Sequence, residues 1–155
     1  MVNANVAFCC GVLGVGVPGT ERFLGDKAAD QDFSSNYGVS PHFPLYLLTR
    51  ACTDGPVPGL ESMLAALQDF ALTRLPPPPE EASAFNVACL AAGLLNAGAT
   101  APVVAPYLDA LLDRQDDDGS WPAWGAYLGF GGRYDGAPAL TTAVAVDALA
   151  KAARP

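Results

Sequence analysis

Three titratable side chains occupy positions from which they could transfer protons. His42 opens an apolar and aromatic segment, HFPLYLLTRA, and an imidazole changes charge near neutral pH. Asp135 lies in a segment rich in glycine and aromatic residues, and Asp147 is the single acid of the apolar segment 141–152. General acid–base catalysis is the chemistry that these groups could supply in an apolar setting. For His42, a purely structural hydrogen bond at a helix start is the open alternative.

Aromatic side chains gather in two segments of the chain and could line a binding cavity. Aromatic faces attract cations and pack against apolar polyenes, so such a cavity suits an apolar ligand. We expect the two segments to meet at one mouth of a ring of helices, and ordinary core packing is the alternative for each residue. The candidate substrate-binding residues are Phe43, Tyr46, Trp121, Trp124, Tyr127, Phe130 and Tyr134.

The sequence predicts no metal site and no cofactor. The chain has one histidine, and its four cysteines at positions 9, 10, 52 and 89 lie in apolar runs. Such cysteines are expected to be buried as small hydrophobic side chains. Cys9 and Cys10 are adjacent and would point to different faces of a helix, which disfavours a shared metal or a disulfide. Reduced thiols fit a cytoplasmic protein.

The charge of the chain disfavours two classes of partner. Its formal net charge is −8, with only eight Lys and Arg residues. Nucleic acids and anionic membrane surfaces both favour clustered positive charge, so neither is expected as a partner. The apolar opening, residues 6–17, is too short to span a bilayer and lacks a basic flank, and we interpret it as part of a buried helix. No transmembrane segment is predicted.

Helices are expected to position these residues. Hydrophobic residues make up 51% of the 155 residues, and proline and glycine stand mostly between the periodic segments. The predicted helices are residues 2–13, about 20–29, 41–52, 60–75, 85–96, 105–114 and 141–152. Nearly uncharged helices alternate with amphipathic ones, which is typical of an inner and an outer layer. We therefore predict an all-α fold in a single domain, residues 1–155.

The segment LLDRQDDDGSW carries the clearest structural motif. Leu111 belongs to the apolar face of a helix that three acidic residues and Gly119 would end. Gly119 suits a left-handed turn position, and Gln115 can hydrogen-bond backbone groups left free at the helix end. Trp121 would then lay its ring against the neighbouring turn.

A degenerate second copy of this motif lies near the start of the chain. Aligning Phe23 with Tyr107 places Gln31 on Gln115 and Tyr37 on Trp121 without a gap, with Ser35 in place of Gly119. The preceding segments, NVAFC at 5–9 and NVACL at 86–90, also match. The chain thus contains two copies of one helix-turn-helix unit.

The pattern L-x3-Q-x3-G-x-W resembles the QW repeat of squalene-hopene cyclases and prenyltransferase-type proteins. The segments VNANVAF, SSNYGVSPHFPLYLLTRA and GAPALTTAVAVDALA are similar to stretches of bacterial cyclase-like proteins of this superfamily. The resemblance implies a partial α/α toroid of alternating inner and outer helices, about half to two-thirds of a full barrel. The acidic D-x-D-D motif of class II terpene cyclases is missing, and DQDF at 30–33 is its nearest approach.

The resemblance implies a terpene cyclase-like protein of bacterial specialised metabolism that acts on or binds an apolar, polyprenyl-type substrate. In an enzyme, His42, Asp135 or Asp147 would assist cyclisation or isomerisation by proton transfer. The alternatives are a non-catalytic binding or accessory half-barrel that completes a partner enzyme, and a piece of a longer barrel. An open arc would expose its first and last inner helices, so we expect a homodimer, or a heterodimer with another half-barrel.

Overall fold

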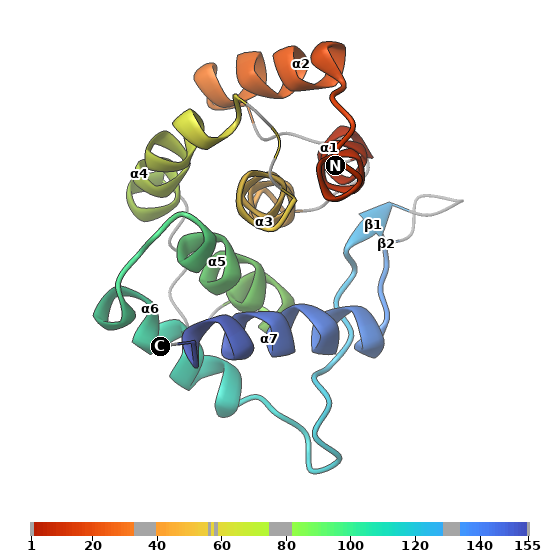
Figure 1. The fold of residues 1–155 in the computed structure, drawn as a ribbon. Coiled ribbons are helices and arrows are strands. Elements are labelled where there is room, and N and C mark those ends of the chain that lie inside the picture. Colours follow the sequence, from red (N-terminus) through yellow and green to blue (C-terminus); the bar gives the residue numbers. More distant parts are fainter. Residues whose placement is uncertain are drawn as a thin grey trace.

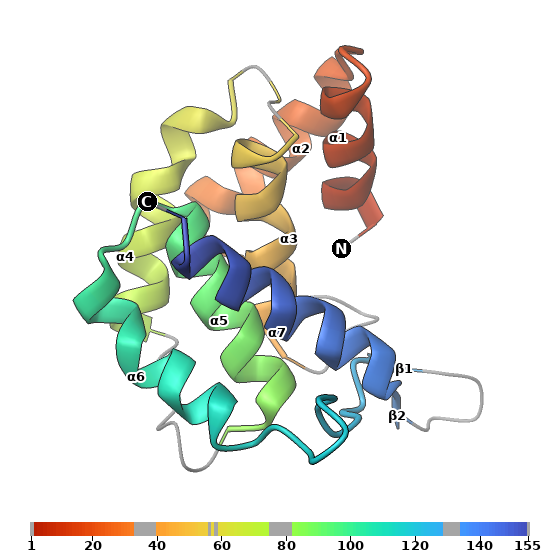
Figure 2. The ribbon, with the colours of Figure 1, turned by 60° about the horizontal axis from the view of Figure 1, so that its bottom comes forward.

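Seven α-helices form the part of the chain that the computed structural model describes, residues 2–32, 40–55, 57, 59–74, 82–128 and 134–154. This confirms the all-α prediction. The helices are α1 (Val2–Val12), α2 (Pro18–Ala29), α3 (His42–Thr53), α4 (Leu64–Arg74), α5 (Ala84–Asn96), α6 (Ala101–Leu112) and α7 (Pro138–Ala152). A short 3₁₀ turn, Glu61–Met63, precedes α4, and two-residue strands β1 (Tyr127–Leu128) and β2 (Tyr134–Asp135) pair antiparallel beside the start of α7 (Figure 2).

Three helices begin earlier than the hydrophobic pattern predicted. Pro18, Pro102 and Pro138 each occupy the first turn of their helix. Proline fits there because the first N–H groups of a helix have no partner within it. Our predicted starts at 20, 105 and 141 came two to four residues late because proline was interpreted as part of the preceding loop.

The helices pack in two groups, as Figure 1 shows. The nearly uncharged helices are successive neighbours, with α3 between α1 and α5, and α5 between α3 and α7. Helices α2, α4 and α6 form an outer crescent around them. Helix α5 is the centre of the core. Of its ten residues from Phe85 to Leu94, nine are buried. The closure of such a crescent into a toroid stays a prediction.

Helix α1 is less buried than its composition predicted. Only Ala4 and Ala7 are buried, whereas Val2 and Val12 are exposed by 64% and 59%. An uncharged helix was expected to lie inside the structure, but among the described helices α1 packs mainly against α3 and α2. Cys9 is likewise exposed, in contrast to the predicted burial of all four cysteines.

Two glycines bring α1 close to the end of α3. A Cβ atom added to Gly11 would lie 2.2 Å from the carbonyl oxygen of Gly55. A Cβ on Gly55 would in turn lie 2.7 Å from the backbone oxygen of Phe8. Backbone therefore packs directly on backbone here, which only glycine permits.

The two predicted helix-turn-helix units are both present. Gly14 follows α1 with φ +68°, and Gly98 follows α5 with φ +81°. Each glycine N–H bonds a carbonyl three residues back, which ends the helix in the same way. Helix α2 ends at Ala29 and α6 at Leu112, within one residue of the alignment. Tyr37, the expected counterpart of Trp121, lies outside the described residues.

The turn after α6 has the structure that its motif predicted. Gly119 adopts φ +83°, and the side-chain amide of Gln115 donates to the Gly119 carbonyl at 2.9 Å. Trp121 is buried, and its indole N–H donates to the Leu111 carbonyl at 2.7 Å. The backbone N–H of Trp121 also donates to the hydroxyl of Thr142, which attaches this turn to α7.

Candidate functional site

A groove of about 350 Å³ lies where α1, α3 and α7 face one another. Its floor is one face of α3, on which side chains recur at the i, i+3, i+4, i+7 spacing of a helix. Asn5 comes from α1, and the remaining side chains come from α7. The lining residues are Asn5, Phe43, Tyr46, Leu47, Arg50, Leu140, Ala143, Val144 and Asp147. This volume falls within the range of small-molecule pockets.

The groove has an apolar end and a polar end. Phe43 and Leu140 stand in the first turns of α3 and α7, and Phe43 packs edge-on against Phe85 with ring centroids 5.1 Å apart. Arg50 lies seven residues further along α3, and Asp147 lies seven residues beyond Leu140 on α7. At the rise of an α-helix, seven residues separate the two ends by about 10 Å.

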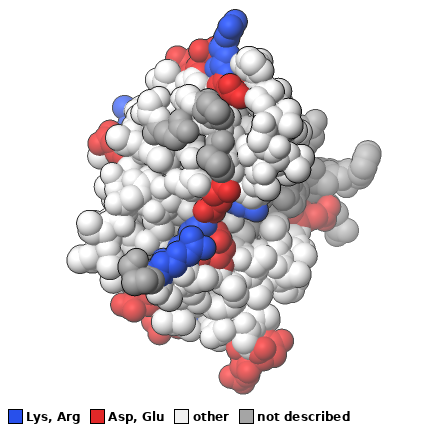
Figure 3. All heavy atoms as spheres, in the orientation of Figure 1, with Lys and Arg blue, Asp and Glu red and all other residues white. Residues whose placement is uncertain are grey.

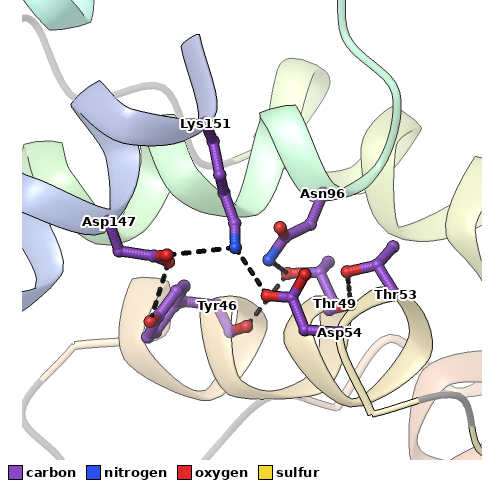
Figure 4. Close-up of polar contacts among 7 residues, drawn as sticks. All are labelled: Tyr46, Thr49, Thr53, Asp54, Asn96, Asp147 and Lys151. Atoms are coloured by element: carbon purple, nitrogen blue, oxygen red, sulfur yellow. Dashed lines mark hydrogen bonds and ion pairs between the residues drawn. The ribbon is translucent and has the colours of Figure 1, made fainter. Parts of the chain in front are cut away.

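A polar network joins α7 to α3 at the polar end (Figure 4). The Tyr46 hydroxyl donates to Asp147 Oδ2 at 3.1 Å, and Lys151 Nζ donates to Asp147 Oδ1 at 3.1 Å. Lys151 also contacts Asp54 at 2.5 Å, and its own side chain is only 6% exposed. One lysine therefore pairs with two carboxylates between the helices, and it balances the charge of only one of them. Both oxygens of Asp147 accept hydrogen bonds.

Burial raises the pKa of Tyr46 well above its ordinary value, and the nearby Asp147 charge raises it further. The Tyr46 hydroxyl is therefore a hydrogen-bond donor throughout the physiological range. Asp147, which accepts from a lysine and a tyrosine, is an acceptor at this site.

A second set of polar contacts fixes α3 against α5. Asn96 donates its side-chain amide to the Thr49 hydroxyl at 3.3 Å, and that hydroxyl donates to the Tyr46 carbonyl at 3.0 Å (Figure 4). Thr49 is completely buried. These bonds hold the turn of α3 that carries Tyr46 and Arg50, and so position the floor of the groove.

Arg50 differs from Lys151 in its surroundings. Its guanidinium carbon lies 3.9 Å from the centroid of the Phe8 ring, a cation–π contact with α1. Within the described ranges, no carboxylate forms an ion pair with Arg50. Figure 3 shows that most of the face in view carries no Lys, Arg, Asp or Glu, that acidic and basic groups lie together near its middle, and that further charges lie around its edges.

The three candidate catalytic residues are not brought together. Asp147 lines the groove, but His42 and Asp135 are not among the lining residues. His42 is buried at the start of α3 with Nδ1 2.6 Å from the Ser40 hydroxyl, so the structural hydrogen bond left open by the sequence is present. Asp135 is exposed on β2.

The aromatic candidates are also divided among several places. Phe43 and Tyr46 line the groove, and Trp121 belongs to the core. Trp124 is 44% exposed and lines a separate hollow of about 390 Å³ with Arg114. Phe130 and the side chains of Tyr127 and Tyr134 lie outside the described residues. Neither the groove nor this hollow is lined by described residues of both aromatic segments.

Sequence reasoning missed Arg50, Asn5 and Lys151. Arg50 carried a recognisable signal, because it continues the helical spacing of Phe43, Tyr46 and Leu47 as the only charge on that apolar face. Lys151 also carried a signal, because it stands four residues after Asp147 on α7, which is the spacing of a helical ion pair. Asn5 had none, since its role depends on how α1 lies beside α3 and α7.

Two other properties of the described part of the chain bear on function. No group of three or more His, Cys, Asp or Glu side chains there could hold a metal ion. No helix there is both long enough and apolar enough to cross a membrane.

Comparison of the chain with protein-family models, with curated proteins and with solved structures gave no match. The resemblance to QW-repeat proteins, which was based on short motifs, therefore stays a prediction.

Proposed function

We propose that this chain is a terpene cyclase-like half-barrel that binds an elongated, apolar molecule of the polyprenyl type in the groove between α1, α3 and α7. The observation that carries the proposal is the lining of the groove. Five of its nine residues, Phe43, Leu47, Leu140, Ala143 and Val144, are apolar, and Tyr46 adds an aromatic face. Burial of a hydrocarbon chain against such a surface is favourable by about 25 cal/mol per Å².

Binding is supported better than proton-transfer catalysis. A cyclase that protonates an alkene needs a carboxylic acid kept neutral in a dry pocket. Asp147 instead accepts from Lys151 and Tyr46, and the other two candidates stand outside the groove lining. The non-catalytic alternative therefore agrees with the contacts of the groove, whereas acid-assisted cyclisation has no donor in it.

Isothermal titration with farnesol, an uncharged polyprenyl alcohol, tests this proposal. Ala143 is exposed in the groove, so Ala143→Trp would fill the groove without disturbing the core. Ala105→Trp is the matched control, because Ala105 is exposed on α6 in the outer crescent. We expect Ala143→Trp to reduce farnesol affinity at least tenfold and Ala105→Trp to leave it unchanged. Equal affinity for all three proteins would refute the groove as the binding site.

We further propose that two copies associate through α1 and α7. Val6 and Leu13 of the first helical segment are exposed by 41% and 74%, and Val146 of α7 by 52%. Exposed apolar side chains that cluster on nearly uncharged helices mark an interaction surface. Because α1 and α7 also border the groove, association there would cover the bound ligand and create a cavity shared by two subunits.

A further inference from the structure

The positive charge of Arg50 faces the groove but would have no partner on an uncharged ligand. Its side chain is partly buried, its guanidinium lies over the Phe8 ring, and it lines the groove. Stacking on Phe8 holds the guanidinium plane but leaves its N–H donors available. In the described part of the chain these donors form no ion pair.

The other cation near the groove is already neutralised. Lys151 pairs with both Asp147 and Asp54, and its side chain is almost wholly buried. The carboxylate of Asp147 is likewise occupied by Lys151 and by the Tyr46 hydroxyl. Arg50 is therefore the group of the groove that can meet a charge on a ligand.

Polar groups accompany Arg50 at its end of the groove. Tyr46 stands one helical turn before Arg50 on α3 and lines the same groove. Asn5 adds a side-chain amide from α1. The opposite end, about 10 Å away along α3, is formed by Phe43 and Leu140.

We propose that the groove selects an apolar chain that ends in a single carboxylate, with the carboxylate on Arg50 and the chain extending toward Phe43. A guanidinium and a carboxylate match in geometry, since two parallel N–H groups meet two oxygens. Arg50 carries one positive charge, and the two carboxylates of Asp147 and Asp54 share a single lysine nearby, so a singly charged carboxylate fits this end of the groove better than a multiply charged phosphate. This inference rests on the proposed function of the groove and narrows its ligand class.

Three ligands with the same hydrocarbon chain test the inference at pH 7.5: farnesol, farnesoic acid and farnesyl monophosphate. We expect farnesoic acid to bind roughly 10- to 100-fold more tightly than farnesol, as for a hydrogen-bonded charge pair. Arg50→Met keeps the apolar stem and should abolish this preference, so that the variant binds farnesoic acid no more tightly than it binds farnesol. Arg22→Met is the control, because Arg22 is exposed on α2.

The outcomes separate the two proposals. Equal binding of farnesol and farnesoic acid, or an unchanged preference in Arg50→Met, would overturn the role of Arg50 and leave the groove proposal standing. Tighter binding of the monophosphate than of the acid would overturn the carboxylate assignment. Failure of all three ligands to bind would overturn the proposed function itself. If Arg50→Met does not fold, added KCl decides on the unmodified protein, since screening must weaken farnesoic acid binding and spare farnesol.

Discussion

The indole nitrogen of Trp121 donates a 2.7 Å hydrogen bond to the main-chain carbonyl of Leu111, ten residues earlier. Leu111 lies in the last turn of α6, where carbonyl groups lack partners within the helix. The same carbonyl accepts from the backbone N–H of Arg114, so the tryptophan supplies its second donor. One side chain thereby closes the end of α6 and fills the core beneath the following turn.

Trp121→Phe should lower the free energy of unfolding by about 2–3 kcal/mol. The change removes a buried hydrogen bond, worth about 1 kcal/mol, and leaves a void where the second ring of the indole was. Urea unfolding followed by circular dichroism measures the loss. Trp124→Phe is the matched control because Trp124 is 44% exposed, and it should change stability by less than about 0.5 kcal/mol. Equal losses in both variants would contradict this account of the motif.

Gly119→Ala should destabilise the protein by about 1–2 kcal/mol. Gly119 has φ +83°, where a Cβ atom strains the backbone, although its nearest neighbour would be Gln115 at an ordinary 3.8 Å. Gly19→Ala provides the comparison, because Gly19 lies in the first turn of α2 with open space around it. That variant should be as stable as the wild type or more stable by up to about 1 kcal/mol. If the urea midpoint falls by the same amount in both variants, the positive φ of Gly119 is not the cause of the destabilisation.

The sequence was informative wherever the contacts are local. The turn from Leu111 to Trp121 spans eleven residues, so a motif could predict its glycine conformation and a hydrogen bond from Gln115 to the backbone, whereas the bond from the Trp121 indole to Leu111 was not predicted. The helices followed from hydrophobic spacing for the same reason. Exposure of α1 could not be predicted, because composition shows that a surface is apolar but not whether a neighbour covers it.

The site was much less predictable than the fold. Tyr46 and Asp147 are 101 residues apart, and Lys151 and Asp54 are 97 apart, so their pairing depends on how α7 crosses α3. Of the predicted site residues, Asp147, Phe43 and Tyr46 line one groove, and their roles there stay a prediction. The spacing of Asp147 and Lys151 on one helix is a local signal for an ion pair that the sequence analysis did not use, whereas the contact of Lys151 with Asp54 could not be predicted from local spacing.

Tyr46→Phe should reveal the hydrogen bond between α3 and α7 through its pH dependence. The phenol ionises near pH 10 in the unfolded chain but at higher pH in the folded protein. A raised folded pKa gives a contribution that is complete below pH 10 and lost as pH rises toward the folded pKa. Near neutral pH we expect Tyr46→Phe to be less stable by about 1 kcal/mol.

Above pH 10 the two stability curves should converge, because only the wild type has this phenol to ionise. The wild type should lose up to about 1.4 kcal/mol more per pH unit than the variant. Urea unfolding between pH 7 and 11 measures both curves. Subtracting the free energy of unfolding of the variant from that of the wild type removes the contribution of all other titrating groups, because the two proteins share them. A gap between the curves that stays constant to pH 11 would show that Tyr46 is not held in its neutral form by the fold.

Gly11→Ala should loosen α1 without unfolding the rest of the chain. Its new Cβ would lie 2.2 Å from the Gly55 carbonyl oxygen, so the backbones of α1 and the end of α3 must move apart. Amide hydrogen exchange should become faster throughout α1 while α5 stays protected. Gly25→Ala on α2 is the control, since its nearest new contact is Met63 Sδ at 4.0 Å. Unchanged exchange in α1 would contradict the close packing.

The same variant links α1 to the groove. Asn5 lines the groove from α1. Displacement of α1 should therefore weaken farnesol binding by Gly11→Ala, while Gly25→Ala should bind normally. Normal binding with a displaced α1 would show that α3 and α7 alone hold the ligand.

Lysine substitutions on α1 and α7 test the predicted homodimer. Val6 and Val146 are 41% and 52% exposed, so lysines there are accommodated in a monomer but would place charge in an apolar interface. Wild-type protein at micromolar concentration should sediment as a dimer and lose stability on dilution, because association is linked to folding by mass action. The Val6→Lys/Val146→Lys variant should sediment as a folded monomer.

Val103→Lys/Leu112→Lys is the matched control on α6, where the native side chains are 37% and 53% exposed, and it should remain dimeric. A wild-type monomer whose stability is independent of concentration would refute the dimer. A dimer that survives the α1 and α7 substitutions would place the interface elsewhere on the chain.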